Sequence, residues 1–234
     1  MQIDKHFSDI PATLVFKDSP KQAAKRGTII FYHGLFSDKS RNLKEYYSLA
    51  DRGFLVIGVD NAGHGERKYP DLEKRAETYE FEPFYYSMLK DTVEEIPGFI
   101  DELSAQNLIV DEKIGVCGIS MGGYIAFASV LQDSRIKAIA PILGNPVWAH
   151  FQEMSPHNHP HKFYPVAVLA QNAGKDRSVS PHHAKTFCDQ LAPHYKKTPH
   201  KLCYYQFPNS GHFMEENEWY ELWENTLNWF EKYI

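Results

Sequence analysis

The sequence predicts an α/β fold in which helices cover both faces of a mostly parallel, doubly wound sheet. Short apolar runs alternate along the chain with longer amphipathic runs, as strands alternate with helices in such folds. Several short runs are apolar nearly throughout, which is typical of strands buried between two helical layers. With 234 residues, 43% of them hydrophobic, the chain can form one sizeable core. We therefore expect a single domain over residues 1–234.

Six runs have the length and composition of buried strands, and five amphipathic segments have helical periodicity. The expected strands are 28–33, 54–60, 113–119, 136–143, 166–173 and 201–207. The expected helices lie near 40–51, 88–104, 120–132, 181–192 and 215–233. The stretch before residue 20 can add one or two strands at the edge of the sheet.

Two long segments interrupt this alternation. Residues 66–87 and 145–164 are rich in aromatic side chains, contain prolines, and each follow the end of an expected strand. Ligands bind at the carboxyl ends of the strands in parallel sheets. We therefore expect both segments to be insertions that cover a site at this edge, as lids do.

Composition and charge exclude several classes of function. The net charge is −5, and no run of basic residues could follow a phosphate backbone, so we expect no nucleic-acid partner. No segment approaches the ~20 apolar residues of a membrane span, and charges interrupt the N-terminal stretch where a signal peptide would be apolar. The cysteines Cys117, Cys188 and Cys203 are scattered and odd in number, which favours a reducing compartment. We expect a cytoplasmic protein that does not bind membranes, and leave open whether it forms a homodimer.

The stretch "GVCGISMGGYIAF", residues 115–127, surrounds Ser120 with glycines. "GISMG" matches G-x-S-x-G between an expected strand and an expected helix, the context in which this motif holds a nucleophile on a strained turn. Gly118 and Gly122 leave room where strand and helix approach too closely for a Cβ atom. The N–H of Met121, at the start of the helix, would face a developing oxyanion. The alternative is a tight structural turn that happens to contain serine.

A serine nucleophile needs a base and an acid that orients the base. The loop after the expected strand 166–173 offers Asp176, and the loop after 201–207 offers His212. The order Ser120, Asp176, His212 is the order that nucleophile-elbow hydrolases use. Asp189 and Glu215 are alternative acids, but Asp189 lies within an expected helix and Glu215 lies beyond the histidine loop.

The motifs "FYHGLFSDK", "GVDNAGHGER", "GISMGG", "AGKDRSV" and "SGHF" occur in the order found in one family. From about residue 28 to the C-terminus the chain resembles an α/β-hydrolase, most closely the small bacterial serine esterases of the dienelactone hydrolase and prolyl-oligopeptidase-like branch. The resemblance implies that Ser120 is the nucleophile, His212 the base and Asp176 the acid. It also implies that the N–H of Leu35 completes an oxyanion hole with that of Met121. Dienelactone hydrolases proper use a cysteine nucleophile, so that particular reaction is not expected here.

The expected activity is hydrolysis of carboxylic esters through an acyl-enzyme, with a small-molecule substrate and no cofactor. Phe36, Trp148 and Phe151 are the expected walls of the substrate pocket, and the shortness of segment 145–164 predicts a preference for acetyl to butyryl esters. Thioester or small-peptide hydrolysis is the alternative within hydrolases. A non-catalytic binding module on the same fold is the alternative outside them.

Histidines outside the expected triad form two groups. The first group comprises His150, His157, His159, His161, His182 and His183. These histidines could hold zinc or copper, but the prolines among them and the absence of cysteine favour ordinary loop histidines, so no metal site is expected. His33 and His64 each precede a glycine at the end of an expected strand, and we expect them to shape the floor of the pocket through hydrogen bonds.

Overall fold

The computed structural model describes all residues, 1–234, and its centre is one eight-stranded sheet of order β1-β2-β4-β3-β5-β6-β7-β8. The strands are β1 (Gln2–Phe7), β2 (Ile10–Val15), β3 (Thr28–Tyr32), β4 (Leu55–Val59), β5 (Ile114–Ile119), β6 (Ile136–Ile142), β7 (Ala167–Ala173) and β8 (Leu202–Phe207). The strands from β4 to β8 across the sheet pair in parallel, whereas β2 runs antiparallel to both β1 and β4. The expected mostly parallel sheet is confirmed, and the N-terminal stretch adds two strands to one side of it, β1 at the edge and β2 beside it.

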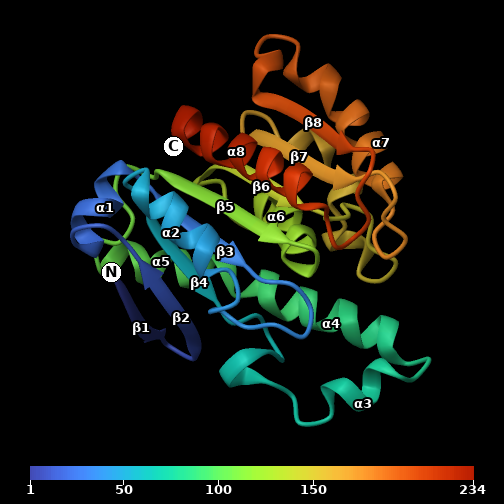
Figure 1. The fold of residues 1–234 in the computed structure, drawn as a ribbon, viewed down its shortest axis with the longest axis horizontal. Helices are drawn as coiled ribbons and strands as arrows, with labels where there is room; N and C mark the ends of the chain where they lie inside the picture. Colours follow the sequence, from blue (N-terminus) through green and yellow to red (C-terminus); the bar gives the residue numbers. More distant parts are fainter.

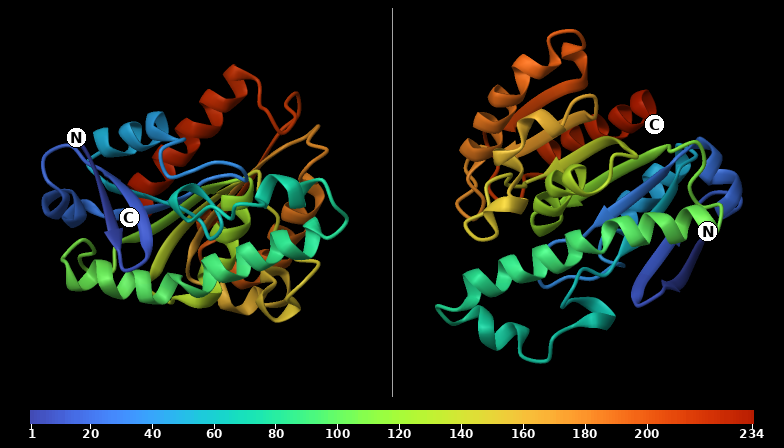
Figure 2. Two further views of the ribbon diagram at one scale, coloured as in Figure 1. Left: turned by 90° about the horizontal axis from the view of Figure 1, so that it is seen from below. Right: turned by 180° about the vertical axis from the view of Figure 1, so that it is seen from behind.

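Helices cover both faces of the sheet (Figures 1 and 2). On one face lie α2 (Leu43–Asp51) and α8 (Glu216–Tyr233), whose apolar side chains share one buried cluster. On the other face, a larger cluster joins α1 (Pro20–Arg26), α4 (Phe81–Glu94), α5 (Ile96–Ala105), α6 (Met121–Gln132) and α7 (Pro181–Leu191). All residues of β3, β4 and β7 are buried, which explains why these strands are apolar nearly throughout. None of the helices combines the length and the apolar character that crossing a membrane requires.

The sequence signal located the strands more closely than the helices. Each expected strand is present to within two residues at its ends, but the expected helix 88–104 is two helices, α4 and α5, which meet at Glu95. Helix α1 was not expected. Its signals are local: the Ser19 hydroxyl accepts a hydrogen bond from Gln22 N at 3.3 Å, and Pro20 occupies the first helical position.

The two insertions differ in structure. Segment 66–87 contains the short helix α3 (Leu72–Ala76) and the first turns of α4, and it extends away from the sheet (Figure 1). Segment 145–164 folds into three turns of 3₁₀ helix: Gln152–Met154, Pro156–Asn158 and Pro160–Lys162. It buries Trp148, Met154 and Phe163 in the larger core cluster. The second segment is therefore packed into the core, whereas the first leaves part of its surface free to line a site.

Candidate active site

Ser120 lies at the sharp turn between β5 and α6, with φ 56° and ψ −114°. A Cβ atom added to Gly122 would lie 1.9 Å from the carbonyl oxygen of Tyr32, and one added to Gly118 would lie 2.1 Å from that of Gly122. Both contacts are with backbone, so neither position can accept a side chain without moving the sheet or the helix. The strained turn expected from the sequence is therefore present, and its glycines are required by space.

The loops after β7 and β8 bring an acid and a histidine to Ser120. His212 Nε2 lies 3.0 Å from Ser120 Oγ, and His212 Nδ1 lies 2.7 Å from Asp176 Oδ2. The Asp176 side chain is fully buried, and its Oδ1 accepts the N–H groups of Ser178 at 2.8 Å and Val179 at 2.9 Å. The structure thus brings together three residues that the sequence singled out, from positions up to 92 residues apart.

These contacts assign the protons. An ionised carboxylate only accepts, so His212 Nδ1 carries the hydrogen and Nε2 presents a lone pair to the Ser120 hydroxyl. This is the tautomer in which an imidazole can remove the proton of an attacking serine. The other two candidate acids do not reach His212: Asp189 forms an ion pair with Lys185, and Glu215 precedes α8 as an exposed residue.

Two backbone N–H groups next to Ser120 are the expected donors of an oxyanion hole. Met121 is the first residue of α6, so its N–H has no acceptor within the helix. Gly34 packs against Ser120, since a Cβ atom built on it would lie 3.7 Å from that of Ser120, and Leu35 follows it in the wall of the same cavity. Leu35 and Met121 both lie next to the Ser120 turn, and their role as an oxyanion hole stays a prediction.

Ser120 and His212 open into a cavity of about 1110 Å³, whose wall combines aromatic and aliphatic side chains with polar and charged ones such as Asp38, Arg41 and Glu82. Phe36, from the loop after β3, stacks on Phe81 at the start of α4, with ring centroids 6.4 Å apart and planes 16° apart. Tyr85 continues this wall and meets Tyr124 of α6 edge to face at 5.7 Å. Part of the wall on this side of the cavity therefore comes from segment 66–87, and its role as a lid stays a prediction.

The expectation for segment 145–164 is corrected. None of its residues lines the cavity. Trp148 is completely buried, and Phe151 packs against the same core cluster. Trp148 lies behind the wall, with its ring 6.1 Å from that of Tyr86, which does line the cavity. The aromatic content of the segment indicated burial but not which surface the rings would face.

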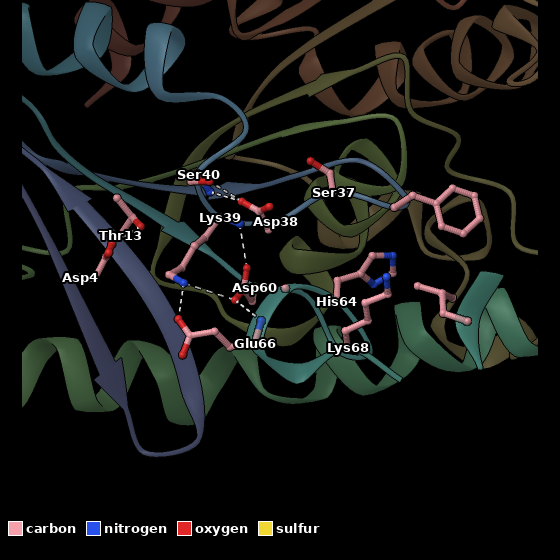
Figure 3. A pocket seen from close by; sticks show the side chains of 13 residues that line it. Asp4, Thr13, Ser37, Asp38, Lys39, Ser40, Asp60, His64, Glu66 and Lys68 are labelled. Atoms are coloured by element: carbon pink, nitrogen blue, oxygen red, sulfur yellow. Dashed lines mark hydrogen bonds and ion pairs between the residues drawn. The ribbon is translucent and has the colours of Figure 1, made fainter. Parts of the chain in front are cut away.

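A second, polar cavity of about 450 Å³ adjoins the first and shares Phe36, Ser37 and Asp38 with it (Figure 3). Asp60 at its floor is 1% exposed. Its Oδ1 accepts Lys39 N at 2.7 Å and its Oδ2 accepts Glu66 N at 2.9 Å, so one carboxylate fixes the loop after β3 to the loop after β4. Lys39 Nζ in turn bonds Glu66. Asp60 was not among the residues expected from the sequence, although its place directly after β4 was a signal.

His33 and His64 are both buried, with ring centroids 5.4 Å apart. His33 Nδ1 lies 2.7 Å from the Gly34 carbonyl oxygen, and its Nε2 accepts Asn61 N at 3.2 Å. Burial lowers the pKa of His33 to about 4, and it lowers the pKa of His64 as well. His64 lines the polar cavity rather than the aromatic one, so the two histidines support the loops beside the site.

The other histidines do not assemble into a metal centre. No three His, Cys, Asp or Glu side chains come together in a way that could hold a metal ion. Local bonds occupy two of the histidines: His157 Nδ1 lies 2.7 Å from Ser155 Oγ, and His159 Nε2 lies 2.8 Å from the Glu153 carbonyl oxygen.

Comparison with known proteins finds hydrolases among the families and relatives that resemble this chain. A model of the family described as "Serine aminopeptidase, S33" matches residues 23–163, and one of the "Prolyl oligopeptidase family" matches residues 142–234. The protein named "Putative esterase YitV" of Bacillus subtilis is 25% identical over 97% of this chain and 96% of its own. "Esterase YjfP" of Escherichia coli is 25% identical over 60% of this chain and 54% of its own.

Solved structures share the fold. TT1662 from Thermus thermophilus superposes with a TM-score of 0.80 at 17% identity, over 99% of this chain and 98% of its own. The acylaminoacyl peptidase of Pyrococcus horikoshii gives a TM-score of 0.70 at 17% identity, over 99% of this chain but only 41% of its own. Since the first family model covers more than half of the sequence, the chain belongs to the serine aminopeptidase, S33, family and is a serine hydrolase with the α/β-hydrolase fold.

Proposed function

We propose that this serine hydrolase cleaves carboxylic esters through an acyl-enzyme, with Ser120 as nucleophile, His212 as base and Asp176 as the acid that orients it. The observation that carries the proposal is the continuous chain of contacts from Ser120 Oγ to His212 Nε2 at 3.0 Å and from His212 Nδ1 to Asp176 Oδ2 at 2.7 Å. His212 would take the Ser120 proton during attack on the carbonyl and give it to the departing alcohol. It would then activate the water that releases the acid.

The proposed oxyanion hole is the pair of N–H groups of Leu35 and Met121. In related chemistry each donor of this kind contributes about 2.7–4 kcal/mol to transition-state stabilisation. The names of the two curated relatives favour an ester over a peptide substrate. The family description keeps small-peptide hydrolysis as the alternative, and thioesters share the same chemistry.

The expected preference for short acyl chains rested on the short segment 145–164 as the cover of the site, with its Trp148 and Phe151 as walls. Neither lines the cavity, and about 1110 Å³ is more space than an acetyl to butyryl group fills. We therefore propose a wider acyl range that includes esters of bulky apolar groups, placed against Phe36, Phe81 and Tyr85. These rings favour apolar and aromatic partners over charged ones.

The first experiment is labelling with a fluorophosphonate probe, which reacts with activated serines. We expect wild type to be labelled and Ser120→Ala to be inert. Ester turnover in Ser120→Ala should fall about 10⁶-fold while the protein stays folded. Lack of labelling in folded wild type would favour the non-catalytic binding module, and more than a tenth of wild-type turnover in Ser120→Ala would place the nucleophile elsewhere.

The same preparation should be assayed with an ester, a thioester and an aminoacyl anilide of matched acyl group. We expect the highest kcat/KM for the ester, because an alcohol leaves with less help than an amine. A higher value for the anilide would replace the ester proposal with the peptide alternative.

A further inference from the structure

We propose that Glu218, acting through Ser210, is a positioning residue that holds the loop carrying His212 in register with Ser120 and Asp176. The inference rests on the proposed function, because it concerns the placement of the proposed base. Glu218 lies in the first turn of α8, six residues beyond His212, and does not touch the candidate triad itself.

Glu218 binds the loop at three points. Its Oε1 accepts Asn209 N at 3.3 Å and Asn209 Nδ2 at 3.0 Å, and its Oε2 accepts the Ser210 hydroxyl at 2.5 Å. Ser210 is fully buried and Glu218 is 7% exposed. Only a carboxylate offers enough acceptor sites for all three donors at once. The hydrogen bonds from Ser210 and Asn209 hold the pKa of Glu218 below its usual value.

The bonding pattern is unlike that of an ordinary helix cap. Glu215 precedes α8, which makes Glu218 the third helical residue, where a glutamate commonly reaches back to the cap residue's own N–H. In this protein the Ser210 hydroxyl connects the two residues instead: it donates to the Glu218 carboxylate and accepts a hydrogen bond from Glu215 N at 3.0 Å. The helix start therefore serves as an anchor for the residues just before His212.

Ser210 also joins the base loop to the acid loop. Its carbonyl oxygen accepts Lys175 N at 2.9 Å, one residue before Asp176. A second backbone bond joins the same two loops, because Gly174 N donates to the Phe207 carbonyl oxygen at 2.7 Å. A shift of Ser210 would therefore change the separation of Asp176 and His212, the two groups that must stay in contact for the correct tautomer.

The competing interpretation is that Glu218 only stabilises the start of α8. The two roles give different kinetics. Loss of a helix-start contact lowers stability but leaves the folded enzyme unchanged, whereas a misplaced base lowers kcat and leaves substrate binding, and so KM, nearly unchanged.

The test compares Glu218→Ala with Glu216→Ala on the full chain. Glu216 lies in the same first turn, is exposed and has no side-chain bond to the loop, so both variants remove one acidic group from the helix start. We expect Glu218→Ala to lower kcat about 10- to 100-fold, the scale of a displacement of ~1 Å, with KM changed less than about twofold. Glu216→Ala should keep wild-type kcat. Glu218→Gln, which keeps part of the acceptor set, should recover part of the loss.

A second arm repeats the Glu218→Ala change in a His212→Ala background and measures the rate of fluorophosphonate labelling. If Glu218 acts by placing His212, its removal should cost nothing further there. An equal loss in both backgrounds, or a change in melting temperature with kcat unaltered, would overturn the proposal.

Should Glu218→Ala not fold, Ser210→Ala removes only the hydroxyl relay and should lower kcat about tenfold. Wild-type kcat in folded Ser210→Ala would then count against the inference. Absence of labelling in wild type is a different result, since it would contradict the proposed function and not only the positioning role of Glu218.

Discussion

The two sides of the site are held in place by different means. On the nucleophile side, residues 34–40, 60–66 and 118–123, the Asp60 carboxylate joins the two loops. The turn that carries Ser120 depends on backbone instead: positive φ at Phe36 and Ser120, and close approach of strand to helix at Gly122. The base side, residues 173–180 and 207–218, depends on side-chain hydrogen bonds to Asp176 and Glu218. Substitutions of the close-packed glycines on the first side should therefore affect folding, whereas substitutions of the hydrogen-bonding acids on the second should affect catalysis in a folded protein.

The largest effect is expected at Gly122. Its alanine Cβ would lie 1.9 Å from the Tyr32 carbonyl oxygen, and backbone cannot move aside as a side chain can. We expect Gly122→Ala to lose more than about 5 kcal/mol of unfolding free energy, measured by urea denaturation. Gly98→Ala is the matched control, because nothing lies within 4 Å of its added Cβ and its helix should gain about 0.5–1 kcal/mol. A stable Gly122→Ala protein would contradict the contrast between the two sides.

On the base side, Asp176→Asn should leave the fold intact and lower ester turnover about 10⁴-fold, because an amide at this position favours the wrong tautomer of His212. The control is Asp189→Asn, which changes an exposed acid paired with Lys185 and should keep full activity. Both are read from kcat together with the melting temperature. Near-normal turnover in Asp176→Asn would transfer the acid role to another residue.

The proposed catalytic positions were more predictable from sequence than the residues around them. Ser120, Asp176 and His212 each follow a strand whose apolar run is visible in the sequence, and parallel strands must end at one edge of the sheet. Trp148 was misplaced because an aromatic residue in an insertion can point into the core or toward a cavity, and no local pattern distinguishes the two. Glu218 could be placed on a helix, but its bond to Ser210 depends on how that helix packs.

The two sides should lose their contributions to stability over different pH ranges. Burial lowers the pKa of His33 to about 4, so below its ordinary pKa of 6.5 the unfolded chain binds a proton that the folded chain refuses. The stability that neutral His33 supplies is complete above pH 6.5 and lost as the pH falls toward 4, by about 3 kcal/mol. The hydrogen bonds from Ser210 and Asn209 lower the pKa of Glu218 from 4.5. The stability that its carboxylate gives to the base side is therefore lost only as the pH falls below 4.5.

Urea denaturation at a series of pH values measures this difference. We expect the unfolding free energy of wild type to fall between pH 6.5 and 4, and to fall less steeply in His33→Gln. Identical slopes in the two proteins would assign the acid sensitivity to other groups, of which His64 is the nearest candidate.

The smallest effect concerns substrate choice and compares one phenylalanine from each side of the cavity. Phe81 stacks on Phe36, whereas Phe213 is 94% exposed, although both line the same cavity. A ring fixed by a neighbour keeps a defined surface for an acyl group, and an aromatic contact of this kind contributes about 0.5–1.5 kcal/mol. We expect Phe81→Leu to lower kcat/KM for ethyl phenylacetate relative to ethyl butanoate about 2- to 10-fold, measured as acid released at constant pH. Phe213→Leu should change the ratio less than about twofold, because a nearly free ring contributes little ordered surface.

An equal shift in both variants would show that stacking on Phe36 does not determine selectivity. No shift in either would place the acyl group elsewhere in the cavity.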